Sequence, residues 1–189
     1  DRPPNILMIM IDDLGWTDLR IQGNEKLETP VIDRLASQGM RFTDNYAAAP
    51  VCSPTRAAIM TGQSPARLAI TNHVSRNQDR FKPEGASLRA AEMYNYLDLE
   101  YVTIAERLKE ADYATAFIGK WHISGLASEM STVEPPRRPE HQGFDVNIGG
   151  VAYGGPPSFF DPYDNPTIED REEGEYLPFR LADEAMGFI

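Results

Sequence analysis

The feature that most constrains the fold is the apolar run at residues 5–11, which stops at two adjacent aspartates, Asp12 and Asp13. A short continuous apolar run rich in isoleucine is typical of a strand buried on both faces, as in a parallel sheet. Adjacent carboxylates at the end of such a strand are costly unless something neutralises them. Two interpretations stay open: a polar turn with a helix N-cap, or a site for a hard cation at the sheet edge where ligands bind.

The segments that follow alternate between helix and strand patterns. Thr29-Pro30 begins a helix that Gly39 ends, and residues 40–46 alternate as a strand does. Thr103 and Glu106 form a capping-box pattern that begins another helix. The later predicted elements are a helix at 54–61, a helix from 104 to about 111, a strand at 113–118, a short strand and turn within 143–150, and a helix from 181. This order predicts an α/β, doubly wound and mostly parallel sheet flanked by helices.

The chain has one cysteine, Cys52, and it lies directly before a short helix pattern. Pro54 suits a first helical turn, and Gly62 suits the left-handed position after the last turn. Cys52 is therefore expected at a helix N-terminus, where backbone N–H groups and the helix dipole favour an anion. Arg56, about one turn further on, can point to the same place. A small buried hydrophobe and a reactive thiolate are the two general interpretations of such a cysteine.

A second polar group, Gly119-Lys120-Trp121-His122, follows the predicted strand at 113–118. Lys120 and His122 can be a surface lysine and a structural histidine, or an anion binder and a proton acceptor. If the strand geometry continues, both side chains point to one face.

The overall charge narrows the classes of partner. The formal net charge is −11, which argues against nucleic acid and anionic membrane surfaces. No apolar run approaches the roughly 20 residues that span a bilayer. An anionic substrate would have to be attracted by local cations. The less regular segment between 66 and 101 offers Arg67, His73, Arg76 and Arg80, each either a solvated loop residue or part of a substrate cleft.

The motif Cys52-Ser53-Pro54-Thr55-Arg56, with Gly62 behind it, resembles the signature of the type I sulfatases. Four further stretches match the same family in the right order. They are Asp12-Asp13-Leu14-Gly15-Trp16, Thr29-Pro30 with its helix, Gly119-Lys120-Trp121-His122 and Gly143-Phe144-Asp145. No single stretch is specific, but the combination is, and it spans nearly the whole chain.

The resemblance implies an alkaline-phosphatase-like α/β fold and hydrolysis of sulfate esters of a small molecule or oligosaccharide, with sulfated carbohydrates favoured. A maturation enzyme would oxidise Cys52 to formylglycine, whose hydrated aldehyde is the nucleophile. Asp12, Asp13 and the modified Cys52 would hold a divalent metal, most often Ca²⁺, with Mg²⁺ as the alternative. The family also implies a periplasmic, secreted or lysosomal location.

Catalytic roles follow from the same resemblance. One oxygen of the hydrate would attack sulfur while the other supports release of sulfate, the splitting logic of covalent catalysis. Arg56 would hold the formylglycine and offset local negative charge. Lys120 would contact sulfate and nucleophile, and His122 would hydrogen-bond the hydrate and accept its proton as the sulfated intermediate breaks down.

The sequence departs from the family pattern in two ways. Thr17 stands where the family usually has glycine, a change we interpret as tolerable. Family members are longer, and their later half supplies another Asp with an Asn or His partner to the metal, and a further Lys and His to the sulfate. Residues 1–189 are thus expected to be the N-terminal portion of one sulfatase catalytic domain, with an incomplete sheet and activity in doubt.

Two other functions stay open. One is a phosphonate or phosphate ester hydrolase of the same superfamily, and the other is a catalytically silent fragment that only binds.

Overall fold

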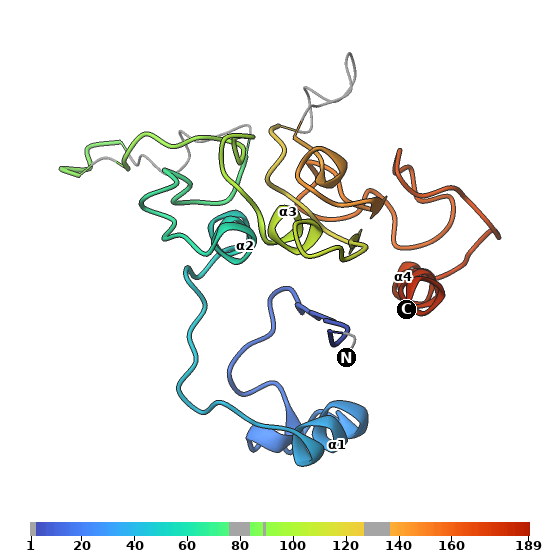
Figure 1. The fold of residues 1–189 in the computed structure, drawn as a ribbon. Helices are drawn as coiled ribbons and strands as arrows, with labels where there is room; N and C mark the ends of the chain where they lie inside the picture. The colour runs from blue at the N-terminus through green and yellow to red at the C-terminus, as the bar shows by residue number, and fades with distance from the viewer. Residues whose placement is uncertain (1–2, 76–83, 89, 127–136) are drawn as a thin grey trace. The chain divides into compact units, whose positions relative to one another are not determined.

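The computed structural model describes residues 3–75, 84–88, 90–126 and 137–189. The chain divides into two compact units, Asp1–Ala47 (unit 1) and Ala48–Ile189 (unit 2), and each is described by itself. Figure 1 shows the elements of both. In chain order they are η1 (Arg20–Gln22), α1 (Pro30–Gln38), α2 (Cys52–Thr61), α3 (Ile104–Lys109), β1 (Ala116–Ile118), η4 (Pro139–His141), β2 (Val146–Ile148) and α4 (Leu177–Phe188).

Unit 1 contains η1 and α1. The helix α1 begins at Pro30 and ends before Gly39, as predicted. Thr29 ties the two helices together, because its hydroxyl accepts from Arg20 N at 3.0 Å and donates to Asp33 Oδ1 at 3.0 Å.

The strands predicted at 5–11 and 40–46 are not present in the described part of unit 1. A strand exists only with a hydrogen-bonded partner, and the described residues of this unit contain no strand that could serve as one. The apolar side chains of both segments are exposed instead: Ile6 is 59%, Ile9 70% and Phe42 69% accessible. The prediction that 5–11 is a strand buried on both faces is therefore wrong for unit 1 as the structure describes it.

Unit 2 is built around two short parallel strands, β1 and β2, which pair Ala116 with Val146 and Ile118 with Ile148. Asp145 joins their starting ends, because its carboxylate accepts from Thr115 N at 2.9 Å and from Lys109 Nζ at 2.6 Å. Together these bonds lower the pKa of Asp145 to about 2, with the Lys109 contact as the larger cause. The strands thus start in register, and their carboxyl ends deliver Gly119 and Gly149 to one edge.

Two apolar cores stabilise unit 2. The larger one combines residues from α2, from the segments after it and from the segment after β1: Ala57, Met60, Leu68, Ile70, Leu97, Trp121 and Ile123. Phe117 packs edge-on against Trp121, with ring centroids 4.9 Å apart. Since Trp121 lies between Lys120 and His122, its burial fixes the backbone of both functional candidates.

The helix α3 has the capping box that the sequence predicts. Thr103 Oγ1 accepts from Glu106 N at 3.3 Å, and Glu106 Oε2 accepts from Thr103 N at 2.7 Å. Thr103 is fully buried and also donates to the carbonyl of Gln142 at 2.7 Å. In Figure 1, α3 lies beside α2 within unit 2.

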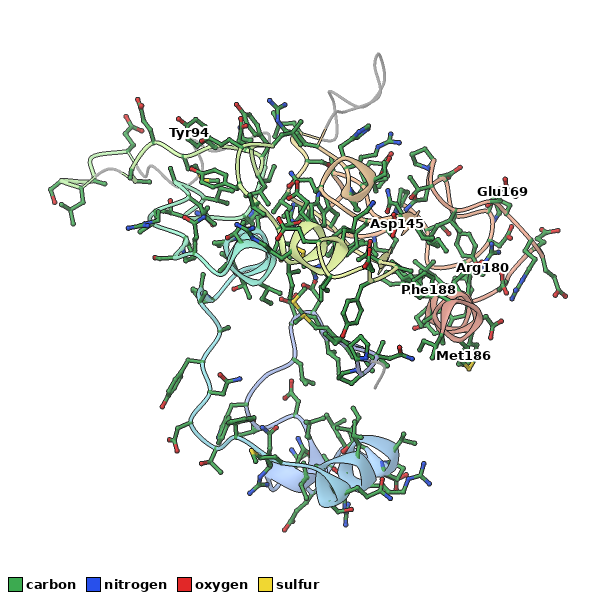
Figure 2. The ribbon with its side chains drawn as sticks, viewed as in Figure 1. Tyr94, Asp145, Glu169, Arg180, Met186 and Phe188 are labelled. Atoms are coloured by element: carbon green, nitrogen blue, oxygen red, sulfur yellow. The ribbon has the colours of Figure 1, made fainter. Side chains whose placement is uncertain are left out.

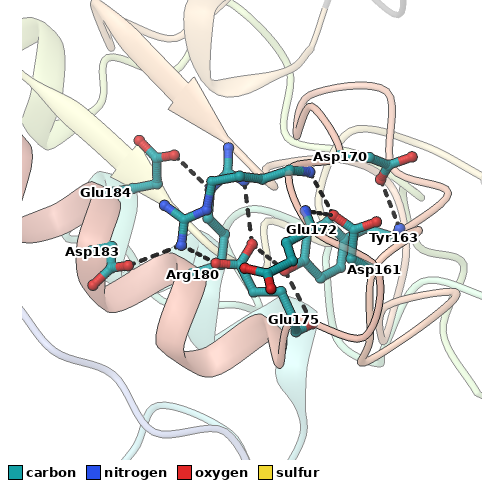
Figure 3. A network of polar contacts seen from close by, with 9 residues as sticks. Asp161, Tyr163, Asp170, Glu172, Glu175, Arg180, Asp183 and Glu184 are labelled. Carbon is teal, nitrogen blue, oxygen red and sulfur yellow. Dashed lines mark hydrogen bonds and ion pairs between the residues drawn. The ribbon is translucent and has the colours of Figure 1, made fainter.

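The helix α4 begins at Leu177, four residues before the predicted start, because Pro178 fits its first turn. A polar network joins α4 to the loop before it (Figure 3). Arg180 Nη1 of the helix donates to Glu175 Oε2 of the loop at 3.5 Å, and Tyr163 OH donates to the same carboxylate oxygen at 3.0 Å. Arg180 is buried, whereas Met186, also on α4, is 68% exposed (Figure 2).

Within the described residues, no helix combines the length and the apolar character that crossing a lipid bilayer requires.

Candidate active site

The helix α2 fixes Cys52 in space. Cys52 is the first residue of the helix, at the N-terminus as expected, and it is half-buried. Thr55 Oγ1 donates to the carbonyl of Ala49 at 2.7 Å, which fixes the chain entering the helix. At the other end Gly62 has a φ of 68°, the left-handed geometry predicted for it. The side chain of Cys52 therefore projects from a short helix held at both ends.

Two side chains of α2 hold the segment 120–122 against the helix. Ser53 Oγ donates to the carbonyl of His122 at 2.9 Å, and Arg56 Nη1 donates to the carbonyl of Lys120. Ser53 and Arg56 are three positions apart, so they lie on the same helical face. Both are buried, at 0% and 5% exposure. This pair of bonds brings the predicted Lys120 and His122 to the first turn of α2.

Lys120 lies next to the cysteine. Its Nζ donates to Cys52 Sγ at 3.2 Å. The thiol stands in for the oxygens that a formylglycine hydrate would carry on the same carbon. A lysine ammonium at this distance favours negative charge on that atom and on any anionic group bound to it.

The strand geometry on which a shared face for Lys120 and His122 would depend does not continue past β1. β1 ends at Ile118, and Gly119 and His122 have φ of 109° and 59°, both in the left-handed region. This φ is uncommon for a residue with a side chain and is often found at functional sites. The two residues meet α2 through a turning backbone held by Ser53 and Arg56, and not through an extended strand.

The ring of His122 is buried, with 5% of the residue exposed. Its Nε2 lies 3.0 Å from the carbonyl of Val74, and its backbone N–H donates to the carbonyl of Val151 at 3.0 Å. Burial and, as the next largest cause, the nearby ammonium of Lys120 together lower the pKa of His122 from 6.5 to about 4. The imidazole is therefore neutral at physiological pH and able to accept a proton.

The remaining candidates are placed as follows. Asp12 and Asp13 are exposed residues of unit 1, whereas Cys52 belongs to unit 2, so the predicted metal site stays a prediction. Arg67 is exposed and His73 is half-buried. Arg76 and Arg80 lie outside the described residues.

Sequence reasoning missed three contributors to this site. Ser53 is part of the motif and lies three positions before Arg56, on the same helical face. This spacing is a sequence signal that could have identified it. Gly154 lies so close to the ring of His122 that a Cβ there would stand 2.9 Å from Cε1 and Nε2. The carbonyl of Val74 carries no sequence signal, because every residue has one.

Comparisons with known proteins show the family of the chain. The family model described as Sulfatase matches residues 4–189, and the chain belongs to that family. N-acetylgalactosamine-6-sulfatase of Canis lupus familiaris is 39% identical over 87% of this chain and 28% of its own length. Steryl-sulfatase of Mus musculus is 43% identical over 78% of this chain and 22% of its own. The chain thus spans about a quarter of the curated relatives it matches.

A solved structure extends the likeness to the fold. The crystal structure of Ps i-CgsB in complex with k-i-k-neocarrahexaose has a TM-score of 0.66 and 26% sequence identity. It covers 94% of this chain, and this chain covers 39% of it. The fold is that of the alkaline-phosphatase-like sulfatases, of which this chain holds a part with a small parallel sheet and helices.

Proposed function

We propose that this chain is the N-terminal portion of the catalytic domain of an enzyme that hydrolyses sulfate esters, with a formylglycine made from Cys52 as nucleophile. The observation that carries the proposal is the contact of 3.2 Å between Lys120 Nζ and Cys52 Sγ at the start of α2. A cation beside the side chain that the family motif assigns to the nucleophile supports this proposal.

The chemistry follows from the residues around that atom. One hydroxyl oxygen of the hydrate would bond to sulfur and give up its proton, and the ester S–O bond would break as the departing ester oxygen takes up that proton and leaves as the alcohol. Lys120 would lie beside the developing negative charge. His122, neutral at physiological pH, accepts a proton from the second hydroxyl. The carbonyl then re-forms, the carbon–oxygen bond to sulfate breaks, and water adds to regenerate the hydrate.

A divalent cation completes the proposal. Adjacent carboxylates such as those of Asp12 and Asp13 supply the hard oxygen ligands that Ca²⁺ and Mg²⁺ require, so the donor set fits such an ion, with an oxygen of modified Cys52 as a further ligand. When bound, the ion would polarise the sulfate oxygens. A maturation enzyme acting on Cys52, and a periplasmic, secreted or lysosomal location, belong to the same proposal.

Sulfated carbohydrates are the proposed substrates. One relative is named for N-acetylgalactosamine-6-sulfate and one neighbour was solved with a neocarrahexaose, although another relative is named for steryl sulfate. Binding without turnover, the silent alternative, is tested by titrating Ca²⁺ in the presence of a sulfated oligosaccharide.

Mass spectrometry and kinetics test the function together. The peptide containing Cys52, from protein made in its own host, is expected to carry the aldehyde or its hydrate. The same protein should then turn over an aryl sulfate faster than an aryl phosphate or phosphonate. An intact thiol contradicts the nucleophile assignment, and the reverse preference supports the phosphoester alternative.

A variant tests Lys120 separately. Lys120→Met should lower kcat/KM for an aryl sulfate by at least about a hundredfold, because it removes a charge beside the developing anion. Lys26→Met, at an exposed lysine of unit 1, is the matched control and should leave turnover unchanged. Equal turnover by the two variants contradicts the role given to Lys120.

A further inference from the structure

Ser53, Val74 and His122 form a closed ring of three hydrogen bonds in unit 2. Ser53 Oγ donates to the carbonyl of His122 at 2.9 Å and accepts from the N–H of Val74 at 2.9 Å. The carbonyl of Val74 in turn lies 3.0 Å from Nε2 of the His122 ring. All three residues are buried, with exposures of 0%, 6% and 5%.

The ring determines which nitrogen of His122 carries the proton. A carbonyl oxygen can only accept, so Nε2 must be the donor. In a neutral imidazole the other nitrogen, Nδ1, then holds the free lone pair. Nδ1 is buried and has no hydrogen-bond partner within the part of the chain that the structure describes. A buried acceptor left unpaired is costly, which favours a donor supplied by another group during function.

We propose that Ser53 is a positioning residue: through Val74 it locks His122 in the Nε2–H tautomer and so assigns Nδ1 as the atom that accepts the proton of the formylglycine hydrate. This inference rests on the proposed function.

The chemistry of Ser53 explains why a hydroxyl is needed. A hydroxyl donates one hydrogen bond and accepts others, so it can satisfy the His122 carbonyl and the Val74 N–H at once. Alanine would leave both groups buried and unpaired. The bonds of Ser53 also support the left-handed φ of 59° at His122, a conformation that persists only where surrounding contacts hold it.

The proton transfer balances as follows. When the sulfated intermediate breaks down, the free hydroxyl of the hydrate gives its proton to Nδ1. The electron pair of that O–H bond forms the C=O bond, and the carbon–oxygen bond to sulfate breaks with its pair on sulfate. His122 is then an imidazolium with a proton on each nitrogen, the Nε2 proton still directed at Val74.

The first test reads the tautomer without reference to activity. Protein carrying ¹⁵N-labelled histidine gives ring nitrogen signals in which a protonated and an unprotonated nitrogen are well separated. The chain has three histidines, so the signals of His122 can be assigned with His73→Gln and His141→Gln variants. At neutral pH, Nε2 of His122 should be protonated and Nδ1 not. A proton on Nδ1 overturns the inference, whether or not the protein is a sulfatase.

The second test reads the step. Ser53→Ala should lower kcat by at least about tenfold with KM little changed, and the first turnover should appear as a burst because sulfate release slows. Ser53→Thr keeps the hydroxyl and should restore most of the rate. Ser37→Ala, which removes a side-chain bond at an exposed position of α1, is the control. Rates are divided by the fraction of chains that carry formylglycine, since Ser53 lies in the motif.

The outcomes separate the two claims. Unchanged kcat in Ser53→Ala overturns the positioning role. If Ser53→Ala does not fold, the tautomer of the wild-type protein decides. If wild-type protein with formylglycine confirmed by mass turns over no sulfate ester, the proposed function is wrong, and with it the assignment of Nδ1 as proton acceptor.

Discussion

Gly154→Ala should disturb the site through the ring of His122. An ideal Cβ at Gly154 would lie 2.9 Å from both Cε1 and Nε2 of that ring, and ordinary van der Waals contact begins at 3.4 Å. The ring or the loop must therefore move by about 0.5 Å, the difference between these two distances. The atom under pressure, Nε2, is the one that bonds to Val74 at 3.0 Å.

The magnitude follows from the cost of overpacking a filled interior, about 1–3 kcal/mol. With a urea slope of about 2 kcal/mol/M, the midpoint of unfolding should fall by about 1 M. A displaced proton acceptor should also reduce kcat, by about tenfold for a shift of this size. Both effects are measured on the same preparation. Circular dichroism during a urea titration gives the midpoint of unfolding, and turnover of an aryl sulfate gives kcat.

The neighbouring Gly155 provides a matched control, because nothing lies within 4 Å of a Cβ built there. Neither glycine has the left-handed φ that would penalise alanine, so only the contact with His122 differs. Gly155→Ala should therefore leave the midpoint and kcat unchanged. Identical behaviour of the two variants would refute the argument that Gly154 is packed against the ring.

Two further predictions concern the stability of unit 2. Thr103→Ala should lower the free energy of unfolding by about 1–3 kcal/mol, because the cap of α3 is lost and the buried carbonyl of Gln142 loses its donor; an unchanged urea midpoint would contradict this. Asp145→Asn should cost stability above pH 3.8, the ordinary pKa, and the difference from wild type should shrink as the pH falls toward about 2, because the folded pKa of Asp145 is lowered by Lys109 and Thr115. A difference between the two proteins that grows toward pH 2 would contradict the assigned sign.

Local sequence signals predicted the helices well. The cap at Thr103, the proline of α1 and the glycine after α2 each act within one turn of chain, so their effect does not depend on distant partners. The sequence predicts the start of α4 four residues too late, because the acidic segment before the helix is typical of a solvated loop, although Pro178 suits a first helical turn.

Strand predictions were less successful for the opposite reason. The apolar run at 5–11 indicates that burying these side chains is favourable, but it does not identify the segment that would cover them. Strand pairing depends on two segments, and the sequence of one does not specify the other. The short strands at 116–118 and 146–148 do form, because Asp145 and Thr115 fix their register at one end.

The proximity of Lys120 to Cys52 is geometry that the motifs suggested but that spacing alone could not establish. Its cause is the pair of bonds from Ser53 and Arg56 to a segment more than sixty positions away. The pattern of residue types identifies the side chains of the candidate site. The backbone carbonyls that hold these side chains in place are found only in the three-dimensional structure.

The ring formed by Ser53, Val74 and His122 has a consequence for folding kinetics. Its three bonds join residues separated by 21, 48 and 69 positions. Closing loops of these lengths costs chain entropy before any bond is gained, so such contacts form later than helices. During refolding, helical circular dichroism should return before catalytic activity, and the interval between the two signals would time the closure of this ring.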